Sequence, residues 1–267
     1  NKVDDDNIKD ILKLSLIGST MDNSNARRDG KCLRYKNHWE ELNFDKTSFI
    51  KSLEKRLLAI REDLINEEKL TDPKIVCGDS RTIIEQELTE KFSLCITSPP
   101  YLNTFDYTDI YRPELFLGQF INSMSELYDL RLTTVRSHVQ AKWNKPNQSN
   151  FGTLYDVALR EIVQRRENLM HKDIPIMIQA YFEDMQNILS TLRKNAKNNA
   201  ELWLVVSTSA YAGIEIPVDM IIGEIGNKVG WYLKDIGVLR YLKKRKSKYS
   251  NEINQLRESV VIFTASK

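Results

Sequence analysis

The sequence has few residues of the kinds that bind metals or form disulfides. Its 267 residues include only three cysteines and three histidines, and Cys32, Cys77 and Cys95 lie far apart. Neither residue type shows the spacing of metal ligands or of a disulfide framework. We therefore predict no metal site, and we expect the cysteines to be reduced thiols buried in the core of a cytoplasmic protein.

Long hydrophobic runs and an excess of one charge are also absent. No apolar stretch approaches the roughly 18 residues of a membrane span, and no signal peptide is visible, so no membrane partner is expected. The chain has 39 basic and 37 acidic residues and a formal net charge of +2. Affinity for an anionic polymer must therefore come from local patches rather than from the overall charge.

The elements that are present indicate an α/β fold. A hydrophobic content of 41% over 267 residues suits one large domain, or a domain with an inserted subdomain. Apolar residues at helical spacing predict helices over 7–20 and 47–64. Short β-forming runs predict buried strands at 74–78 and 92–97, and between them we expect a helix over 80–88 with Ser80 as its N-cap.

The last third of the chain continues this alternation and ends in two strands. We predict a strand within 200–209, a helix over 217–230, and strands over 231–242 and 258–265 that form a hairpin. The sheet should therefore be mostly parallel and end in a hairpin. Residues 1–114 and 176–267 are expected to form the main domain, and the polar, aromatic segment 115–175 is expected to be a variable insertion.

The tetrad Ser98, Pro99, Pro100 and Tyr101 directly follows the strand predicted at 92–97, where open α/β sheets bind ligands. Each proline fixes φ and removes a backbone donor, so the turn is stiff and presents its carbonyl groups outward. The Ser98 side chain and the Pro99 carbonyl can together accept both hydrogens of an exocyclic amino group on a nucleobase. Tyr101 can stack on that base once it has left its duplex.

With this tetrad, the sequence resembles the amino-group DNA methyltransferases, which transfer methyl from S-adenosylmethionine (SAM) to cytosine N4 or adenine N6. The resemblance covers nearly the whole chain. Its other motifs are "DGKCLRY" (29–35), "GDSR" (78–81), "YFEDM" (181–185), "STSAYAGIEIPVDMI" (207–221) and "LRESVVIF" (256–263). It implies a Rossmann-like methyltransferase fold, SAM as cofactor, double-stranded DNA as partner and a place in restriction and modification. It also makes the variable segment 115–175 a candidate target-recognition insertion.

A tetrad that begins with serine is typical of the cytosine-N4 members of this family, so the resemblance favours a cytosine target. Adenine-N6 specificity and an RNA or protein amide substrate stay open. The resemblance also implies that Asp79 contacts the adenine moiety of SAM, with Ser98 beside the cofactor. A turn or helix-capping role is the alternative for Asp79.

Further residues are candidates for contacts with the base and with DNA. We expect Asp106, Tyr107 and Arg112 to line or brace the base pocket, although the same residues also suit the start of a surface helix with Asp109 near its N-terminus. The residues expected to contact DNA are Trp143, with its neighbours Lys142 and Lys145, and the basic stretch Lys243, Lys244, Arg245, Lys246 and Lys248. A solvated hairpin loop is the alternative for 243–248.

The chain departs from the family pattern at the cofactor. The family has a glycine-rich turn of the type Asp-Pro-Phe-x-Gly-x-Gly-Thr-Thr, which lets the backbone approach the methionine part of SAM, and an acidic residue for its ribose. Neither occurs here. We therefore expect the first two strands of the sheet to lie upstream of Asn1 or on a partner polypeptide of a split enzyme. A non-catalytic DNA-binding subunit derived from such an enzyme is the alternative.

Overall fold

The computed structural model describes residues 3–29, 32–66, 73–243, 253 and 255–266. The chain divides into two compact units. The helical unit comprises Asn1–Ile75 and Asp106–Arg131, and the sheet unit comprises Val76–Phe105 and Leu132–Lys267. The tetrad Ser98–Tyr101 belongs to the sheet unit.

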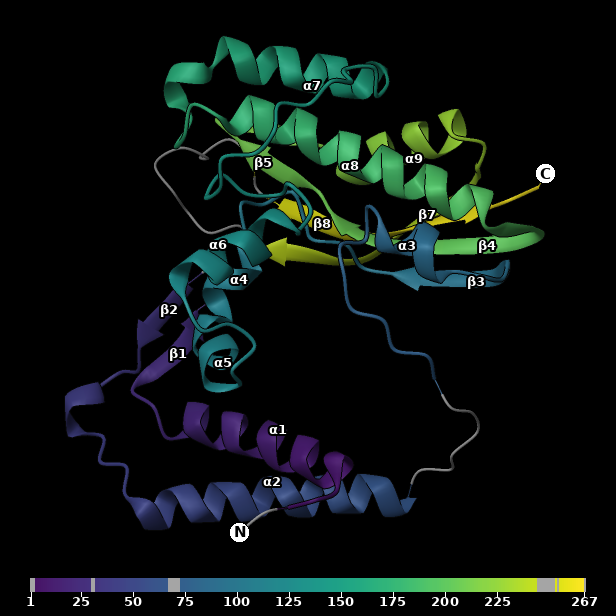
Figure 1. Cartoon of the computed structure of the whole chain (residues 1–267). Helices are drawn as coiled ribbons and strands as arrows, with labels where there is room; N and C mark the ends of the chain where they lie inside the picture. The colour runs from purple at the N-terminus through teal and green to yellow at the C-terminus, as the bar shows by residue number, and fades with distance from the viewer. Residues whose placement is uncertain (1–2, 30–31, 67–72, 244–252, 254, 267) are drawn as a thin grey trace. The chain divides into compact units, whose positions relative to one another are not determined.

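The helical unit contains two long helices, α1 (Asp6–Asp22) and α2 (Lys46–Asn66), which confirm the two helices predicted from apolar spacing. Asp5 caps α1, because its carboxylate accepts a hydrogen bond from the backbone N–H of Ile8 at 3.1 Å. The two helices pack against each other. They form the antiparallel pair at the base of the unit in Figure 1.

The remaining elements of the helical unit are short. They are β1 (Ala26–Asp29), β2 (Cys32–Tyr35), the 3₁₀ turn η1 (Trp39–Glu41), α4 (Tyr107–Ile110), α5 (Arg112–Leu117) and α6 (Met124–Leu132). β1 and β2 pair as an antiparallel hairpin, which the sequence patterns did not predict. Its charged residues lack the alternation of apolar and polar side chains that predicts a strand.

The sheet unit is built on four strands in the order β3-β4-β8-β7. They are β3 (Phe92–Thr97), β4 (Ala196–Ser207), β7 (Tyr232–Lys243) and β8 (Gln255–Thr264), all at predicted positions. β3 and β4 are parallel, whereas β4–β8 and β8–β7 are antiparallel. The described residues therefore form a mixed sheet with the expected hairpin, and not a mostly parallel one.

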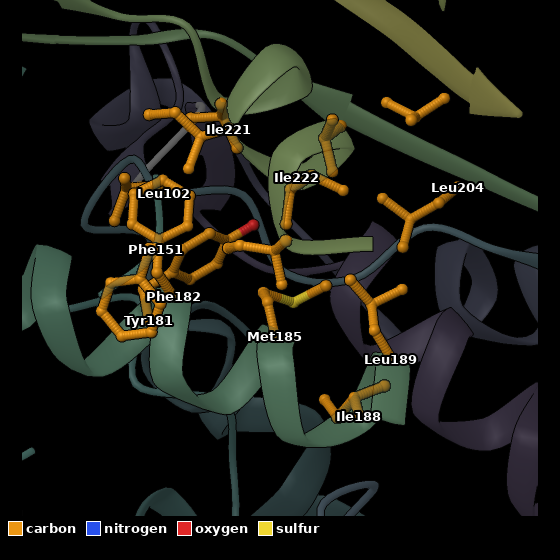
Figure 2. Close-up of a cluster of buried hydrophobic side chains, with 14 of the residues drawn as sticks. Leu102, Phe151, Tyr181, Phe182, Met185, Ile188, Leu189, Leu204, Ile221 and Ile222 are labelled. Atoms are coloured by element: carbon orange, nitrogen blue, oxygen red, sulfur yellow. The ribbon is translucent and has the colours of Figure 1, made fainter. Parts of the chain in front are cut away.

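Helices cover one face of this sheet. They are α3 (Ile83–Glu87), α8 (Ile174–Lys194) and α9 (Val218–Lys228), with α7 (Thr153–Gln164) outside α8 in Figure 1. The 3₁₀ turn η2 (Arg166–Asn168) and the small hairpin of β5 (Ser209–Tyr211) and β6 (Ile214–Ile216) complete the unit. Figure 2 shows part of the core between these layers. Phe182 of α8 lies beside Phe151 and Tyr181, and Met185 of α8 belongs to the same cluster as Leu204 of β4 and Ile222 of α9.

The strand predicted at 74–78 is wrong. These residues have no strand conformation, and the Ile75 side chain is 88% exposed. Ser80 is not an N-cap either. The backbone N–H groups of Thr82 and Ile83 both bond to the Asp79 carbonyl, so a turn precedes α3, and Thr82 holds the N-cap position.

The opposite face of the sheet is apolar and open in the part of the chain that the structure describes. Leu94 and Ile96 of β3 are 53% and 67% exposed, and Trp203 of β4, which pairs in register with Ile96, is 39% exposed. Alternate residues of β4, such as Leu202 and Leu204, are fully buried under the helices. β3 also lies at the edge of the described sheet, so it combines an apolar face with an unpaired side.

The cysteines are less buried than expected. All three are free thiols, but Cys77 is exposed, and Cys32 and Cys95 are only partly buried. Burial raises the pKa of the Cys95 thiol, which packs against the core. Among the described residues, no group of histidines, cysteines and carboxylates has the arrangement of a metal site. The described helices are too short or too polar to cross a membrane.

Candidate active site

The tetrad leaves the carboxyl end of β3 as an irregular segment. Ser98 is exposed, whereas Pro99, Pro100 and Tyr101 are partly buried. The two prolines fix the backbone here and have no N–H groups that could compete for nearby acceptors. Ser98 therefore stands on a stiff segment and its side chain is accessible to a ligand.

A buried carbonyl anchors the chain directly after the tetrad. The carbonyl oxygen of Leu102 accepts hydrogen bonds from the Ser209 hydroxyl and, at 3.1 Å, from the Tyr211 hydroxyl. Both donors belong to β5, which follows the central strand β4. Burial raises the pKa of Tyr211, so its hydroxyl stays protonated and donates. The tetrad is thus fixed to the middle of the sheet unit and not only to its edge strand.

Two further backbone contacts shape this turn. The N–H of Asn103 bonds to the Tyr101 carbonyl at 2.8 Å, and the N–H of Thr104 bonds to the Ser137 carbonyl at 3.0 Å. Thr104 has φ = 62°, in the left-handed region that β-branched residues rarely adopt. A strained residue of this kind persists only where the surrounding contacts hold it.

The ring of Tyr101 is held from the terminal hairpin. The Tyr101 hydroxyl donates to Glu258 Oε1 at 2.6 Å, and the other carboxylate oxygen of Glu258 pairs with Arg240. Arg240 lies on β7 and Glu258 on β8, in direct register. The hydrogen bond from Arg240 lowers the pKa of Glu258 more than burial raises it, and the bond from Tyr101 lowers it further.

Asp79 lies in a network of charges. Its carboxylate accepts three hydrogen bonds from the Arg81 guanidinium, the shortest at 2.6 Å, and Arg81 also contacts Asp184 at 3.5 Å. The backbone N–H of Arg81 bonds to Asp79 as well, which is the turn geometry that was the alternative for this residue. Its contact with the cofactor stays a prediction.

The same network continues into the segment predicted to be an insertion. Arg136, which is buried, forms ion pairs with Asp184 and Glu183 of α8, each at 2.6 Å. Glu183 in turn accepts hydrogen bonds from the backbone N–H groups of Asn147 and Gln148. The motif 181–185 therefore anchors the irregular chain before α7.

Trp143 lies in this irregular chain. Its indole N–H donates to the His138 carbonyl at 2.9 Å, and its ring lies 5.1 Å from the ring of His138. The side chain is partly buried, so part of its surface packs within its own segment. DNA contact by Trp143 stays a prediction, as does contact by its exposed neighbours Lys142 and Lys145.

Asp106, Tyr107 and Arg112 lie in the helical unit. Asp106 is buried and caps α4: one oxygen accepts from the N–H and hydroxyl of Thr108, and the other pairs with Arg131 at 2.7 Å. Tyr107 is exposed, and Arg112 pairs with Asp109 at 3.3 Å. Their predicted role at the base pocket stays a prediction.

The basic stretch 243–248 falls almost wholly outside the described residues. Lys243 is the last residue of β7. Lys244, Arg245, Lys246 and Lys248 are not among the residues that the structure describes. The strands β7 and β8, which precede and follow this stretch in the sequence, pair antiparallel as predicted.

Proteins with similar sequences are methyltransferases. The chain is 28% identical over 262 residues to the type II methyltransferase M.AvaI of Nostoc sp. (strain PCC 7120 / SAG 25.82 / UTEX 2576), and equally to that of Anabaena variabilis. Each match covers 87% of this chain and 53% of the relative. It is 27% identical over 305 residues to the type II methyltransferase M.BsoBI of Geobacillus stearothermophilus, covering 96% and 59%. Type II methyltransferases are homologues of this chain. No family model matches it.

The methyltransferase resemblance predicted from the sequence motifs is thereby confirmed. The chain spans between 53% and 59% of the length of these curated methyltransferases.

Several residues of this candidate site were not predicted from the sequence. Ser209, Tyr211 and Glu258 hold the tetrad, although their motifs 207–221 and 256–263 were noted only as part of the methyltransferase resemblance. Glu258 is 157 positions from Tyr101, so no local spacing could connect the two. The signal that could have found it is a carboxylate just before the apolar run 260–263 of a predicted strand, because a carboxylate buried there needs a partner.

Proposed function

We propose that this chain carries the catalytic and base-binding part of a site-specific DNA methyltransferase that modifies the exocyclic N4 amino group of a flipped cytosine. One observation carries the proposal. The tetrad Ser98–Tyr101 stands at the carboxyl end of β3, with Ser98 exposed and the following Leu102 carbonyl anchored by two buried hydroxyl groups. The homology with type II methyltransferases supports methyl transfer to DNA, and the serine of the tetrad favours cytosine as the target.

In this proposal the tetrad acts by accepting hydrogen bonds. SAM, when bound, supplies a methyl group on a sulfonium sulfur. The Ser98 hydroxyl and the Pro99 carbonyl accept the two amino hydrogens of the base, so the lone pair of the nitrogen points toward that methyl group. Transfer would break the bond between the methyl group and sulfur, form a bond from the methyl group to the amino nitrogen, and release the surplus amino proton to solvent. No covalent enzyme intermediate is needed, because in-line geometry and hydrogen bonding lower the barrier.

The described residues fit only part of the cofactor. Asp79 is the candidate for its adenine end, but both carboxylate oxygens already bond to Arg81. No glycine-rich turn of the family type occurs in the sequence. We therefore propose a Rossmann-like sheet that continues beyond the open edge of β3. Strands from a segment outside these 267 residues would pair there and hold the rest of SAM, either on the same polypeptide or on a partner.

The proposed DNA contacts come from three separate parts of the chain. We place the target-recognition segment in 115–175, with Trp143, and the base pocket near Asp106, Tyr107 and Arg112. Phosphate contacts are assigned to the basic stretch 243–248. Neutralising two of its lysines should weaken binding to all DNA sequences alike and reduce the log–log salt slope by about one unit per lost contact. An unchanged slope would show that this stretch is a solvated loop.

Product analysis tests the proposed reaction. The full-length protein is incubated with genomic DNA and tritiated SAM, and the digested nucleosides are separated by mass spectrometry. We expect N4-methylcytosine. N6-methyladenine would keep the enzyme class and correct the target. DNA binding without any labelled nucleoside would favour the alternative, a non-catalytic subunit that lost the cofactor half of its site.

A further inference from the structure

The contact between Tyr101 and Glu258 differs from the other contacts of the tetrad. The backbone is fixed through the Leu102 carbonyl, which Ser209 and Tyr211 hold. The bond from the Tyr101 hydroxyl to Glu258 instead acts on the far end of the ring. It therefore restricts the direction of the side chain and not the path of the chain.

Glu258 is suited to hold a phenol in one orientation. It is only 8% exposed and lies on β8, in the middle of the β4–β8–β7 ladder. Its pKa is lowered, first by Arg240, so it stays ionised near neutral pH and can only accept. Arg240, 67% exposed at its side chain, pairs with the second carboxylate oxygen from the adjacent strand. The Tyr101 hydroxyl thus meets a fixed acceptor with a charge, which gives a stronger hydrogen bond than a neutral acceptor would.

We infer that Glu258 is a positioning residue that fixes the Tyr101 ring as a preformed stacking surface for the target base, with Arg240 orienting Glu258. The inference rests on the proposed function, in which Tyr101 stacks on a flipped base. A ring that is already held loses little side-chain freedom when the base arrives. A ring without this bond must be ordered during the reaction, so the methyl acceptor spends less time in the reactive position.

A double-mutant cycle in the full-length protein tests this inference. The variants are Tyr101→Phe, Glu258→Met and the double variant, with single-turnover methylation and DNA affinity measured for each. We expect each single variant to slow methylation about tenfold, as for one lost hydrogen bond to a charged group. The double variant should be no slower than either single variant, and DNA affinity should stay within about twofold, because phosphate contacts dominate it.

Two further variants separate positioning from folding. Glu258→Gln keeps an acceptor oxygen for the Tyr101 hydroxyl, so it should recover most of the rate that Glu258→Met loses. Glu201→Gln is the matched control, because Glu201 lies on the neighbouring strand β4 and also pairs across strands, with Lys234 at 2.7 Å. It should leave the rate unchanged. A normal thermal unfolding transition in each variant would show that the sheet is intact.

The outcomes distinguish this inference from the proposed function. If the two substitutions have independent, multiplying effects on the rate, Glu258 does not act through Tyr101 and the positioning role is wrong, although methylation stands. A loss of rate in Glu258→Gln as large as that in Glu258→Met, with a normal unfolding transition, also overturns it. If the unmodified protein methylates no DNA, the proposed function fails, and the positioning role fails with it.

Discussion

At the scale of single residues, Ser98 is the most direct test of the chemistry. It is exposed at the end of β3, so Ser98→Ala should leave folding and DNA affinity nearly unchanged. If its hydroxyl accepts an amino hydrogen in the transition state, the substitution should slow methyl transfer about a hundred- to a thousandfold, or roughly 2.7–4 kcal/mol. A tritiated-methyl assay measures the rate. Ser93→Ala, at another exposed serine on β3, is the matched control. Full turnover by Ser98→Ala would remove Ser98 from the mechanism.

Two buried tyrosines offer a second test at this scale. The Tyr211 hydroxyl donates to the Leu102 carbonyl, whereas the buried Tyr155 hydroxyl has no hydrogen-bond partner among the described residues. Tyr211→Phe should therefore lower the free energy of unfolding by about 1 kcal/mol, and Tyr155→Phe should leave it unchanged or raise it slightly. Denaturant unfolding measures both. Equal changes in the two variants would contradict the anchoring role of Tyr211.

The sequence predicted the tetrad of this candidate site but not the residues that hold it in place. Ser98 to Tyr101 are adjacent in the chain, and two prolines after a predicted strand are a local signal. The bond from Tyr101 to Glu258 and the bonds from Ser209 and Tyr211 to Leu102 join segments about a hundred residues or more apart. Such contacts depend on how β4 and β8 pair, which local patterns do not determine.

At the scale of elements, most strands with a strong hydrophobic pattern were predicted correctly, and the hairpin without such a pattern was not. The apolar strands β3, β4 and β8 appear where they were expected. The run at 74–78 also contains β-forming residues, Ile75 and Val76, but it pairs with no strand among the described residues. β-propensity reflects packing against neighbours, so composition alone could not decide this case. The charged hairpin of β1 and β2 was missed for the opposite reason, since its residues have no apolar alternation.

The charge network on α8 gives a prediction for pH. Burial alone would raise the pKa of Glu183, but the hydrogen bonds from Arg136 and from the N–H groups of Gln148 and Asn147 lower it below its ordinary value. The pKa of a glutamate in the unfolded chain is about 4.3. The stabilisation from Glu183 is therefore fully present above that pH and is lost as the pH falls through the lower folded pKa.

Unfolding measurements across this range check the prediction. The free energy of unfolding should decrease as the pH falls below about 4.3, and Glu183→Gln should be less stable at neutral pH but show a shallower decrease. Glu167, on the exposed turn η2, provides a control, because Glu167→Gln should change neither the stability nor its pH dependence much. An unaltered decrease in Glu183→Gln would show that other carboxylates account for it.

At the scale of the whole molecule, the open edge of the sheet unit gives a test of the proposed additional strands. β3 has one neighbour in the described sheet, and Leu94 and Ile96 expose apolar surface beside it. An apolar edge strand without charges or prolines within it tends to pair with another strand. We therefore expect residues 1–267 alone to be poorly soluble and to show no SAM binding by calorimetry. A longer protein that contains the additional strands should bind SAM and methylate DNA.

Substitution on this face separates the two forms. In residues 1–267 alone, Ile96→Lys should improve solubility, because it places a charge on exposed apolar surface. In the longer, active protein the same change should weaken SAM binding, because the lysine would be buried under the added segment. Val163→Lys, at an exposed position on α7, should alter neither property. If residues 1–267 are monodisperse, bind SAM at micromolar strength and methylate DNA, then the cofactor site is built from this chain alone and the edge of β3 needs no further strand.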